Sequence, residues 1–273
     1  MYLYYLGPQG TFSYLAAQQY CNDKHEHIVL SPKNQLHEVM TALIDDTDGQ
    51  AIVPIENAIE GTINIVADTL VEQPFTVVGE VFLDVTFGLY VKSSQSLASI
   101  KKVYSIGPAI SQTQKFIQRH QLAYAYTHST ISALDYINDT TAAIAPLGSG
   151  EMYGFTPIAT HIEDYPHNQT RFLVLQHADT VKHHSGRSCL LVITPQQDKP
   201  GLLASILNTF ALFNVNLSWI ESRPLKTQLG MYRFFVQAVC PDQQVLDKIR
   251  TILETLDFNV QSLGRFNSHS PDE

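Results

Sequence analysis

The sequence predicts an α/β protein in which two lobes flank a cleft and a smaller α+β domain follows. Three observations carry this prediction. Over about the first 180 residues, apolar strand segments alternate with amphipathic helices, which is the pattern of mainly parallel sheets with short connections. A polar, histidine-rich stretch at 178–186 reads as a linker. Beyond it, the periodicity gives the order strand, helix, strand, strand, helix, strand.

Composition narrows the class of protein. The chain has 273 residues, 44% hydrophobic and 16% charged, which is enough for one large and one small globular domain. A net charge of −9 argues against nucleic acid and anionic membranes as partners, because both need a basic surface. The N-terminal segment 1–6 lacks a basic leader, and no apolar run is long enough to span a membrane. Three widely spaced cysteines favour a reducing, cytoplasmic location.

In the first part of the chain, each expected strand ends at a glycine, serine or threonine cluster that opens a helix. The expected strands are 3–6, 51–55, 103–106, 124–126 and 142–145, and the expected helices are 14–20, 62–71, a segment around Phe116 and Ile117, and 131–137. The segment 80–90 is rich in β-formers and predicts a crossing between the lobes.

Ligands of such sheets collect outside the carboxyl ends of the strands, where helices begin. The polar residues at these points are Thr11, Ser13, Asn57, Ser129 and Thr130. Their hydroxyl and amide groups can bind an anion together with free backbone N–H groups, and the hydroxyls can equally cap the helices.

The second part of the chain predicts a ferredoxin-like fold from its element order. The expected strands are 188–194, 216–224, 232–239 and 260–266, and the expected helices run over 202–213 and 245–256. The final segment 267–273 is expected to fray.

Thr170 and Arg171 carry the most chemistry. They place a neutral hydroxyl beside a permanent cation where an apolar strand begins, which suits an anionic substrate that must lose a hydroxyl group. Thr170 can also simply begin the strand, and Arg171 can form a structural salt bridge. Thr170 and Phe172 share a face in a regular strand, so a bend near Thr170 is expected if Phe172 belongs to the core.

The eleven histidines give no metal site with familiar ligand spacing. His25 and His27 flank one glutamate, and His183 and His184 lie in the linker, without a completing ligand set. No metal is therefore expected.

Several short motifs occur together in one order. They are Gly7–Ser13, Pro54–Asn57 with Gly61, Ser129–Thr130, Ala142–Ala145, Tyr153–Gly154, Asn168–Phe172, Asp198–Leu203 and Glu221–Pro224. On these motifs the chain resembles, over almost its whole length, the prephenate dehydratases that carry a C-terminal ACT regulatory domain. The resemblance implies a periplasmic-binding-protein-like catalytic domain at 1–180 and an ACT domain at 187–266. Lobe 1 would cover about 1–78 with 163–180, and lobe 2 about 79–162.

The resemblance also implies an activity and a site. The family converts prephenate to phenylpyruvate, carbon dioxide and water without a metal or organic cofactor. Thr170 would assist departure of the hydroxyl group. The implied substrate-binding residues are Thr11, Ser13, Asn57, Ser129, Thr130, Asn168, Arg171 and Phe172. Glu56 is expected to anchor its loop, since a carboxylate would repel the dianionic substrate.

Regulation is implied by the C-terminal motifs. The inhibitor L-phenylalanine would bind Gly201, Leu202, Leu203, Asn216, Leu217, Glu221, Ser222, Arg223 and Pro224. The only tryptophan, Trp219, precedes Glu221 by two residues and is expected to report binding. The family implies a homodimer or homotetramer, without nucleic-acid or membrane partners.

Three positions depart from the family pattern. Ala58 stands where serine is common, and Ile106 and Pro108 stand where histidine and glutamine are common. Two alternative functions stay open from the sequence: dehydration of arogenate instead of prephenate, and a non-catalytic module that binds a small anion.

Overall fold

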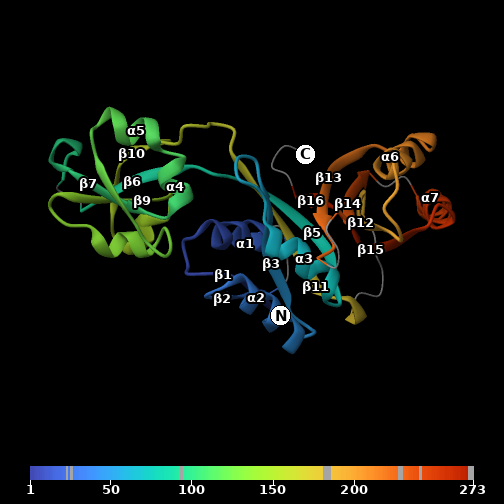
Figure 1. Ribbon diagram of the computed structural model, residues 1–273. Coiled ribbons are helices and arrows are strands. Elements are labelled where there is room, and N and C mark those ends of the chain that lie inside the picture. The colour runs from blue at the N-terminus through green and yellow to red at the C-terminus, as the bar shows by residue number, and fades with distance from the viewer. Residues whose placement is uncertain are drawn as a thin grey trace.

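The structure is a computed structural model that describes residues 1–22, 24, 27–92, 95–180, 186–226, 230–239 and 242–269. Three sheets lie in a row, with the sheet of the first lobe in the middle (Figure 1). In chain order, the elements of the two lobes are β1 (Tyr2–Leu6), α1 (Phe12–Asn22), β2 (Val29–Lys33), α2 (Leu36–Asp45), β3 (Gln50–Asn57), β4 (Gly61–Thr62), α3 (Asn64–Glu72), β5 (Phe75–Asp84), β6 (Phe87–Val91), β7 (Lys102–Ser105), α4 (Gly107–Ser111), α5 (Gln114–Arg119), β8 (Ala123–Tyr126), β9 (Thr141–Pro146), β10 (Thr156–Thr160) and β11 (Gln169–His177), with short 3₁₀ helices at Leu97–Ser99, Ser132–Tyr136, Gly150–Tyr153 and Ala178–Thr180. The C-terminal elements are β12 (Ser188–Pro195), α6 (Leu202–Leu212), β13 (Leu217–Pro224), β14 (Tyr232–Val239), α7 (Gln243–Thr255), β15 (Phe258–Phe266) and β16 (Ser268–His269).

The first lobe is built on a seven-stranded sheet, counted over the described residues, in the order β16-β5-β11-β3-β1-β2, with β4 beside β3. Strands β1, β2 and β3 are parallel, whereas β11 runs antiparallel to both of its neighbours. Helix α1 covers one face, where Tyr14 and Tyr20 pack with Phe172 and Val174. Helices α2 and α3 cover part of the other face.

The second lobe has a five-stranded sheet among the described residues, in the order β10-β6-β9-β7-β8. Strands β7, β8 and β9 are parallel, and β6 and β10 add antiparallel edges. The expected mainly parallel sheets are therefore mixed. The reason is topological: the chain enters and leaves this lobe through β5–β6 and β10–β11, and these crossing strands add antiparallel to the parallel cores.

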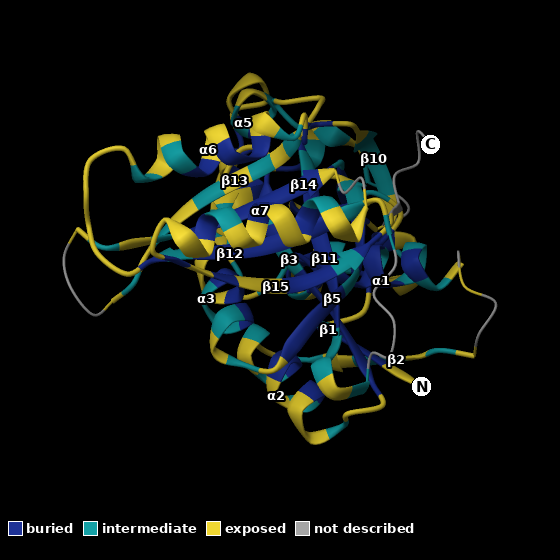
Figure 2. Ribbon diagram, turned by 90° about the vertical axis from the view of Figure 1, so that its right-hand side faces the viewer, coloured by how far each residue is buried: buried dark blue, intermediate teal, exposed yellow. Residues whose placement is uncertain are grey.

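The C-terminal domain has the expected β-α-β-β-α-β order. Its sheet order, β13-β14-β12-β15, is that of a ferredoxin-like fold. Helices α6 and α7 cover one face and bury Ile206, Phe210, Ile249 and Leu253 against it. Their outer sides are exposed, while the strands behind them are largely buried (Figure 2).

The other face of this sheet packs on the first lobe. Leu190, Val192 and Phe235 share one apolar cluster with Leu173 and Leu175 of β11. Strands β15 and β5 approach so closely that a Cβ added at Gly264 would lie 2.2 Å from the Val77 carbonyl oxygen. The C-terminal domain is thus a continuation of the first lobe's core.

Several sequence-based expectations need correction. Segments 29–33, 36–45 and 156–160 form elements that the sequence pattern did not indicate, and 131–137 contains a 3₁₀ helix instead of a longer helix. Strand β5 belongs to the first lobe's sheet up to Asp84, so the crossing lies at Val85–Thr86, within the expected crossing segment 80–90. The lobe boundary therefore lies later than the expected position near residue 78. The tail does not simply fray, because β16 pairs parallel with β5. Residues 181–185 of the expected linker, 227–229 between the expected strands 216–224 and 232–239, and 270–273 of the expected tail lie outside the described residues.

Candidate active site

Thr170 lies at the start of β11, at the edge where the first lobe meets the second. Its register partner on β3 is Asn57, the last residue of that strand, and both side chains are buried. Since β3 and β11 are antiparallel, the end of one and the start of the other meet at the same sheet edge. This edge is also the carboxyl end of the parallel strands β1 and β3, where ligands collect in such sheets.

Hydrogen bonds at both ends of its side-chain amide fix the orientation of Asn57. Its Oδ1 accepts hydrogen bonds from the backbone N–H groups of Ile59 and Glu60, both at 3.0 Å. Its Nδ2 therefore faces the other way and donates to Thr170 Oγ1 at 2.9 Å and to Asn168 Oδ1 at 2.9 Å. Because Thr170 Oγ1 accepts from Asn57, the Thr170 hydroxyl proton remains available to a third group.

A chain of amides then links the two lobes. Asn168 Nδ2 donates to Gln112 Oε1 at 2.9 Å, and Gln112 Nε2 donates to Glu60 Oε1 at 3.2 Å. Gln112 follows helix α4 of the second lobe and is buried. Each polar group in this row, which is buried up to the exposed Glu60, is positioned by the next one. The row therefore fixes Thr170 relative to both lobes.

A cavity of about 260 Å³ lies between the lobes at the end of β1. Its lining comes from both lobes: Leu6, Gly7, Thr11, Phe12, Ser13, Asn34, Ile106, His128, Ser129 and Thr130. Strand β3 lies between β1 and β11, so this cavity is about 10 Å from Thr170 along the sheet edge, by the usual strand spacing.

Two of the hydroxyl groups at this cavity act as caps. Thr11 Oγ1 donates to the carbonyls of Leu6 and Pro8 and accepts from Tyr14 N–H at 3.4 Å. Ser129 and Ser132 cap one another reciprocally at 2.9 and 3.0 Å. The other backbone N–H groups in the first turn of α1, those of Phe12 and Ser13, have no intrahelical acceptor and can bind an anion in the cavity.

Arg171 lies on the opposite face of β11 from Thr170. Its Nε donates to Glu80 Oε2 at 2.7 Å, and its Nη2 donates to Gln237 Oε1 of the C-terminal domain. Its guanidinium also lies over the Trp219 ring, 5.2 Å from the centroid. The structure thus gives Arg171 the salt-bridge role, and it contradicts the expectation that this cation faces the substrate.

Phe172 is 1% exposed and packs beneath α1. It does share the face of Thr170, but no bend of β11 is needed, because β11 pairs with β5 in unbroken register from Gln169 to Val174. The irregularity lies in β3, between the partners of Arg171 and Phe172. Phe172 fills the core two residues further along the strand, so the expected bend and a substrate contact for Phe172 are both wrong.

The proposed effector residues lie on two elements of the C-terminal domain. Gly201, Leu202 and Leu203 are at the start of α6, where Gly201 has a φ of +86°. Leu217 to Pro224 form β13, an edge strand in the described sheet, and Asn216 precedes it. Arg223 Nη2 pairs with Asp68 of α3 at 3.0 Å. Within the described residues, no hydrogen bond or ion pair joins the two segments.

Comparisons with known proteins show which family this chain is similar to. A family model described as prephenate dehydratase matches residues 3–180. The prephenate dehydratase of Bacillus subtilis (strain 168) is 33% identical, covering 97% of this chain and 98% of the relative. The chain belongs to the prephenate dehydratase family.

Solved structures of the family cover the C-terminal domain as well. The prephenate dehydratase of Staphylococcus aureus subsp. aureus Mu50 is 58% identical with a TM-score of 0.90, covering 98% of this chain and all of the other. The prephenate dehydratase of Arthrobacter aurescens, solved in complex with L-Phe, is 29% identical with a TM-score of 0.84, covering 98% and 90%.

Sequence reasoning missed three groups at this prephenate dehydratase cleft. Gln112 and Glu60 join the amide chain, and His128 lines the cavity beside Ser129. The polar sequence Glu60-Gly61 after Asn57 was the available signal for Glu60, whose carboxylate accepts from Gln112. The expected loop-anchoring role of Glu56 stays a prediction. Among the departures, Ile106 lines the cavity, whereas the exposed Ala58 contributes its backbone N–H to the Gln169 carbonyl.

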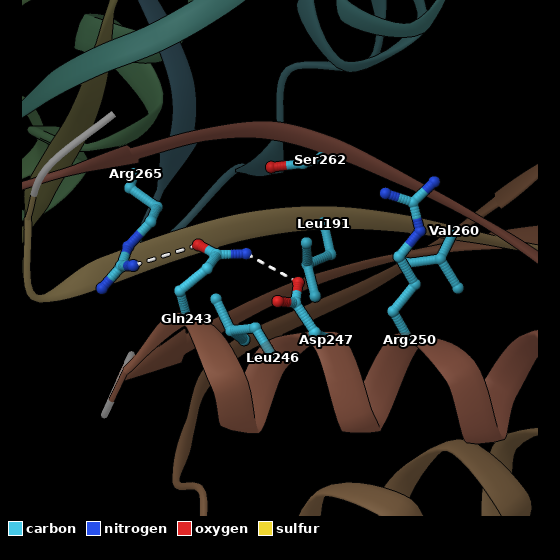
Figure 3. A pocket seen from close by; sticks show the side chains of 8 residues that line it. All are labelled: Leu191, Gln243, Leu246, Asp247, Arg250, Val260, Ser262 and Arg265. Carbon is cyan, nitrogen blue, oxygen red and sulfur yellow. Dashed lines mark hydrogen bonds between the residues drawn. The ribbon is translucent and has the colours of Figure 1, made fainter. Parts of the chain in front are cut away.

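Other hollows fit the family's chemistry less well. A cavity of about 180 Å³ between α7 and strands β12 and β15 has a floor of Leu191, Leu246 and Val260 (Figure 3). Its guanidinium groups already bind neighbouring side chains, Arg265 to Gln243 and Arg250 to Glu254.

Among the described residues, no three histidine, cysteine or carboxylate side chains form a metal-binding group, and His25, His183 and His184 lie outside them. None of the described helices has the length and apolarity to cross a membrane.

Proposed function

We propose that this chain is a prephenate dehydratase that forms phenylpyruvate, carbon dioxide and water. The observation that carries the proposal is the direction of the Asn57–Thr170 hydrogen bond. A hydroxyl that accepts from an amide keeps its own proton for another acceptor, and the hydroxyl leaving group of prephenate is such an acceptor.

The reaction needs help at the leaving group. The electron pair of the breaking C–C bond to the ring carboxylate enters the ring, carbon dioxide leaves, and the opposite C–O bond breaks as the ring becomes aromatic. Thr170 donates its proton to the departing oxygen, so the group leaves as water, and Thr170 then regains a proton from solvent. Assistance of this kind typically raises the rate by ~10²–10⁴-fold.

Binding of the dianionic substrate falls to groups from both lobes. Ser13 and the α1 N-terminus line one side of the inter-lobe cavity, and Thr130 with His128 lines the other. Arg171 and Phe172 leave the substrate-binding set, and Thr11 and Ser129 serve chiefly as caps. In this proposal residues 1–180 form the catalytic domain, with the lobe crossing at Val85–Thr86.

Regulation is assigned to the C-terminal domain. Its ferredoxin-like topology and the L-Phe complex of the Arthrobacter aurescens relative support an ACT domain at 187–266 that binds L-phenylalanine as inhibitor. The effector set is the one at Gly201–Leu203 and Asn216–Pro224, with assembly as a homodimer or homotetramer. A cytoplasmic location stays an expectation from the cysteine pattern.

The test is an assay of the purified protein with prephenate, without added metal or cofactor, with and without L-phenylalanine. Phenylpyruvate should form, and L-phenylalanine but not D-phenylalanine should lower the rate. Thr170→Ala should reduce kcat by at least ~100-fold with little change in KM, whereas Thr170→Ser should retain part of kcat. An alanine variant with full activity would remove Thr170 from the mechanism.

Two alternatives give different outcomes in the same assay. A higher kcat/KM for arogenate than for prephenate in direct competition would change the substrate. Tight binding of prephenate without phenylpyruvate release would make the chain a binding module.

A further inference from the structure

A buried charged cluster joins the catalytic strand to the C-terminal domain. Arg171 and Glu80 come from β11 and β5, and Gln237 and Trp219 come from β14 and β13. Arg171, Glu80 and Gln237 are 5%, 2% and 4% exposed. Groups of this kind are rarely buried unless every partner is in place.

Gln237 binds both members of the ion pair. Its Oε1 accepts from Arg171 Nη2, while its Nε2 donates to Glu80 Oε1 at 3.2 Å. The guanidinium and the carboxylate are therefore each held by one end of the same amide. Removing that amide keeps the Arg171–Glu80 ion pair but leaves Arg171 Nη2 and Glu80 Oε1 without this buried partner.

Arg171 is bonded through the backbone to Thr170, and both residues are paired on either side. In the sheet register, Thr170 pairs with Leu83 of β5 and with Asn57 of β3. Arg171 pairs with Phe82 of β5 and with Glu56 of β3. A rotation or shift of β11 at Arg171 therefore moves the Thr170 hydroxyl relative to Asn57. Near-attack geometry tolerates little displacement of this kind.

We infer that Gln237 and Trp219 of the C-terminal domain are positioning residues for Thr170, acting through Arg171 and Glu80. The inference rests on the proposed function and extends it. The C-terminal domain helps to position the catalytic strand β11. It therefore affects the rate of catalysis in the absence of an effector as well as the response to an effector.

The same cluster gives regulation a route. Trp219 lies on β13, two residues before Glu221, and its ring is tilted against Phe235 of β14 with 6.3 Å between centroids. A ligand that displaces β13 alters the contact of Trp219 with Arg171. If such a ligand weakens binding in the inter-lobe cleft, linkage requires that a cleft ligand weaken its binding by the same factor. We expect the contact of Trp219 with Arg171 to respond to both ligands.

The test variant is Gln237→Met, which keeps the length of the side chain and removes its hydrogen bonds with Arg171 and Glu80. Gln261→Met is the matched control, because Gln261 lies exposed on β15 of the same sheet. We expect Gln237→Met to lower kcat about tenfold with KM changed less than about twofold, the size typical of losing one buried partner of a charged group. The control should keep the wild-type kcat.

A second readout separates positioning from general destabilisation. The emission of Trp219, the only tryptophan, should change on addition of phenylpyruvate to wild type and to Gln261→Met, and should change much less in Gln237→Met. Wild-type kcat in a Gln237→Met variant, or an unaltered fluorescence response, would overturn the inference.

Trp219→Phe provides a milder variant if Gln237→Met does not fold. It retains an aromatic ring and weakens the contact with Arg171, so kcat should fall about two- to threefold, with KM unchanged. An unchanged kcat in this variant counts against the inference. The proposed function fails separately: wild type without turnover of prephenate rejects the activity, and the Trp219 response to phenylpyruvate still tests the coupling.

Discussion

The side chain of Asn57 shows how one amide can set the direction of a proton. Its carbonyl end is occupied by two backbone N–H groups of the following turn, so the amino end must face Thr170. An aspartate at this position would accept at both ends and could not donate, and a serine or threonine would offer a single oxygen in place of the two separate ends of the amide. The amide is therefore as necessary to the chemistry as the hydroxyl that it holds.

Asn57→Asp should abolish this arrangement with almost no change in shape. One carboxylate oxygen still accepts from the turn, but the other faces Thr170 and takes its proton as a hydrogen bond. We expect kcat to fall by about 100-fold, within the range for losing acid assistance, while the variant stays folded. Steady-state kinetics and thermal unfolding measure the two effects.

Asn138→Asp is the control for that substitution. Asn138 Oδ1 also accepts a backbone N–H, from Thr140 at 3.0 Å, but the residue is exposed in the second lobe. Its aspartate should preserve both the turn and kcat. Equal losses in the two variants would mean that the added charge, and not the lost donor, is responsible.

At the scale of elements, β11 divides the chemistry between its two faces. Thr170 faces the α1 side and Arg171 the side of the C-terminal domain, so adjacent residues of one motif serve different partners. The sequence predicted the strand and two alternative roles for Arg171, a cation for the substrate or a member of a structural salt bridge. It could not choose between them, because the deciding partner, Gln237, is 66 residues away along the chain.

The pattern of strands and helices was predictable where apolar periodicity was strong, as in α7 and β14. It failed for β2, whose sequence Val-Leu-Ser-Pro-Lys contains a proline and has no buried residue. Such an edge strand has no alternation of buried and exposed positions to detect. Gln112 was missed for a different reason: it ends a five-residue helix, and its function depends on contacts with the other lobe.

Gln112 gives a prediction about the pairing of the lobes. Gln112→Leu removes the acceptor of Asn168 and the donor to Glu60, so the second lobe no longer positions the amide chain behind Thr170. We expect kcat/KM for prephenate to fall about tenfold, as for the loss of one buried hydrogen-bond partner.

Gln114→Leu is the matched control, because Gln114 Nε2 binds only the nearby Ile110 carbonyl among its described hydrogen bonds. It should keep kcat/KM within about twofold of wild type, as expected for a substitution away from the site. If Gln112→Leu behaves like this control, the amide chain is structural and does not contribute to catalysis.

At the scale of the whole molecule, the three sheets are joined in different ways. The two lobes meet through separate contacts. They are polar where Gln112 meets Asn168 and where Tyr153 Oη donates to the Gln9 carbonyl at 2.8 Å, and apolar where Phe12 packs edge-on against Phe87 at 5.4 Å between ring centroids. The C-terminal domain meets the first lobe through an apolar core and buried charges. A cleft that must open and close can use the first kind of contact, whereas a domain that supports a strand needs the second.

One ion pair at this domain boundary makes stability depend on pH. Asp68 of α3 accepts from Arg223 at 3.0 Å and pairs with Lys226 Nζ at 2.8 Å. Burial alone would raise the pKa of the Asp68 carboxyl, but the hydrogen bonds from Arg223 and Lys226 outweigh it and lower the pKa from 3.8. The folded state therefore binds this proton less readily than the unfolded chain does.

The sign of the effect follows from that difference. The stabilisation is present above about pH 4 and is lost as pH falls through the lowered folded-state pKa. Asp68→Asn should lower the free energy of unfolding at pH 7 by about 1 kcal/mol, a typical value for a partly exposed ion pair. In urea titrations the gap between variant and wild type should narrow as the pH is lowered below 4. Asp48→Asn, at an exposed turn of the same lobe, should show no such gap at pH 7. If the difference in free energy of unfolding between Asp68→Asn and wild type were the same at pH 7 and below pH 4, shape, and not charge, would hold α3 against β13.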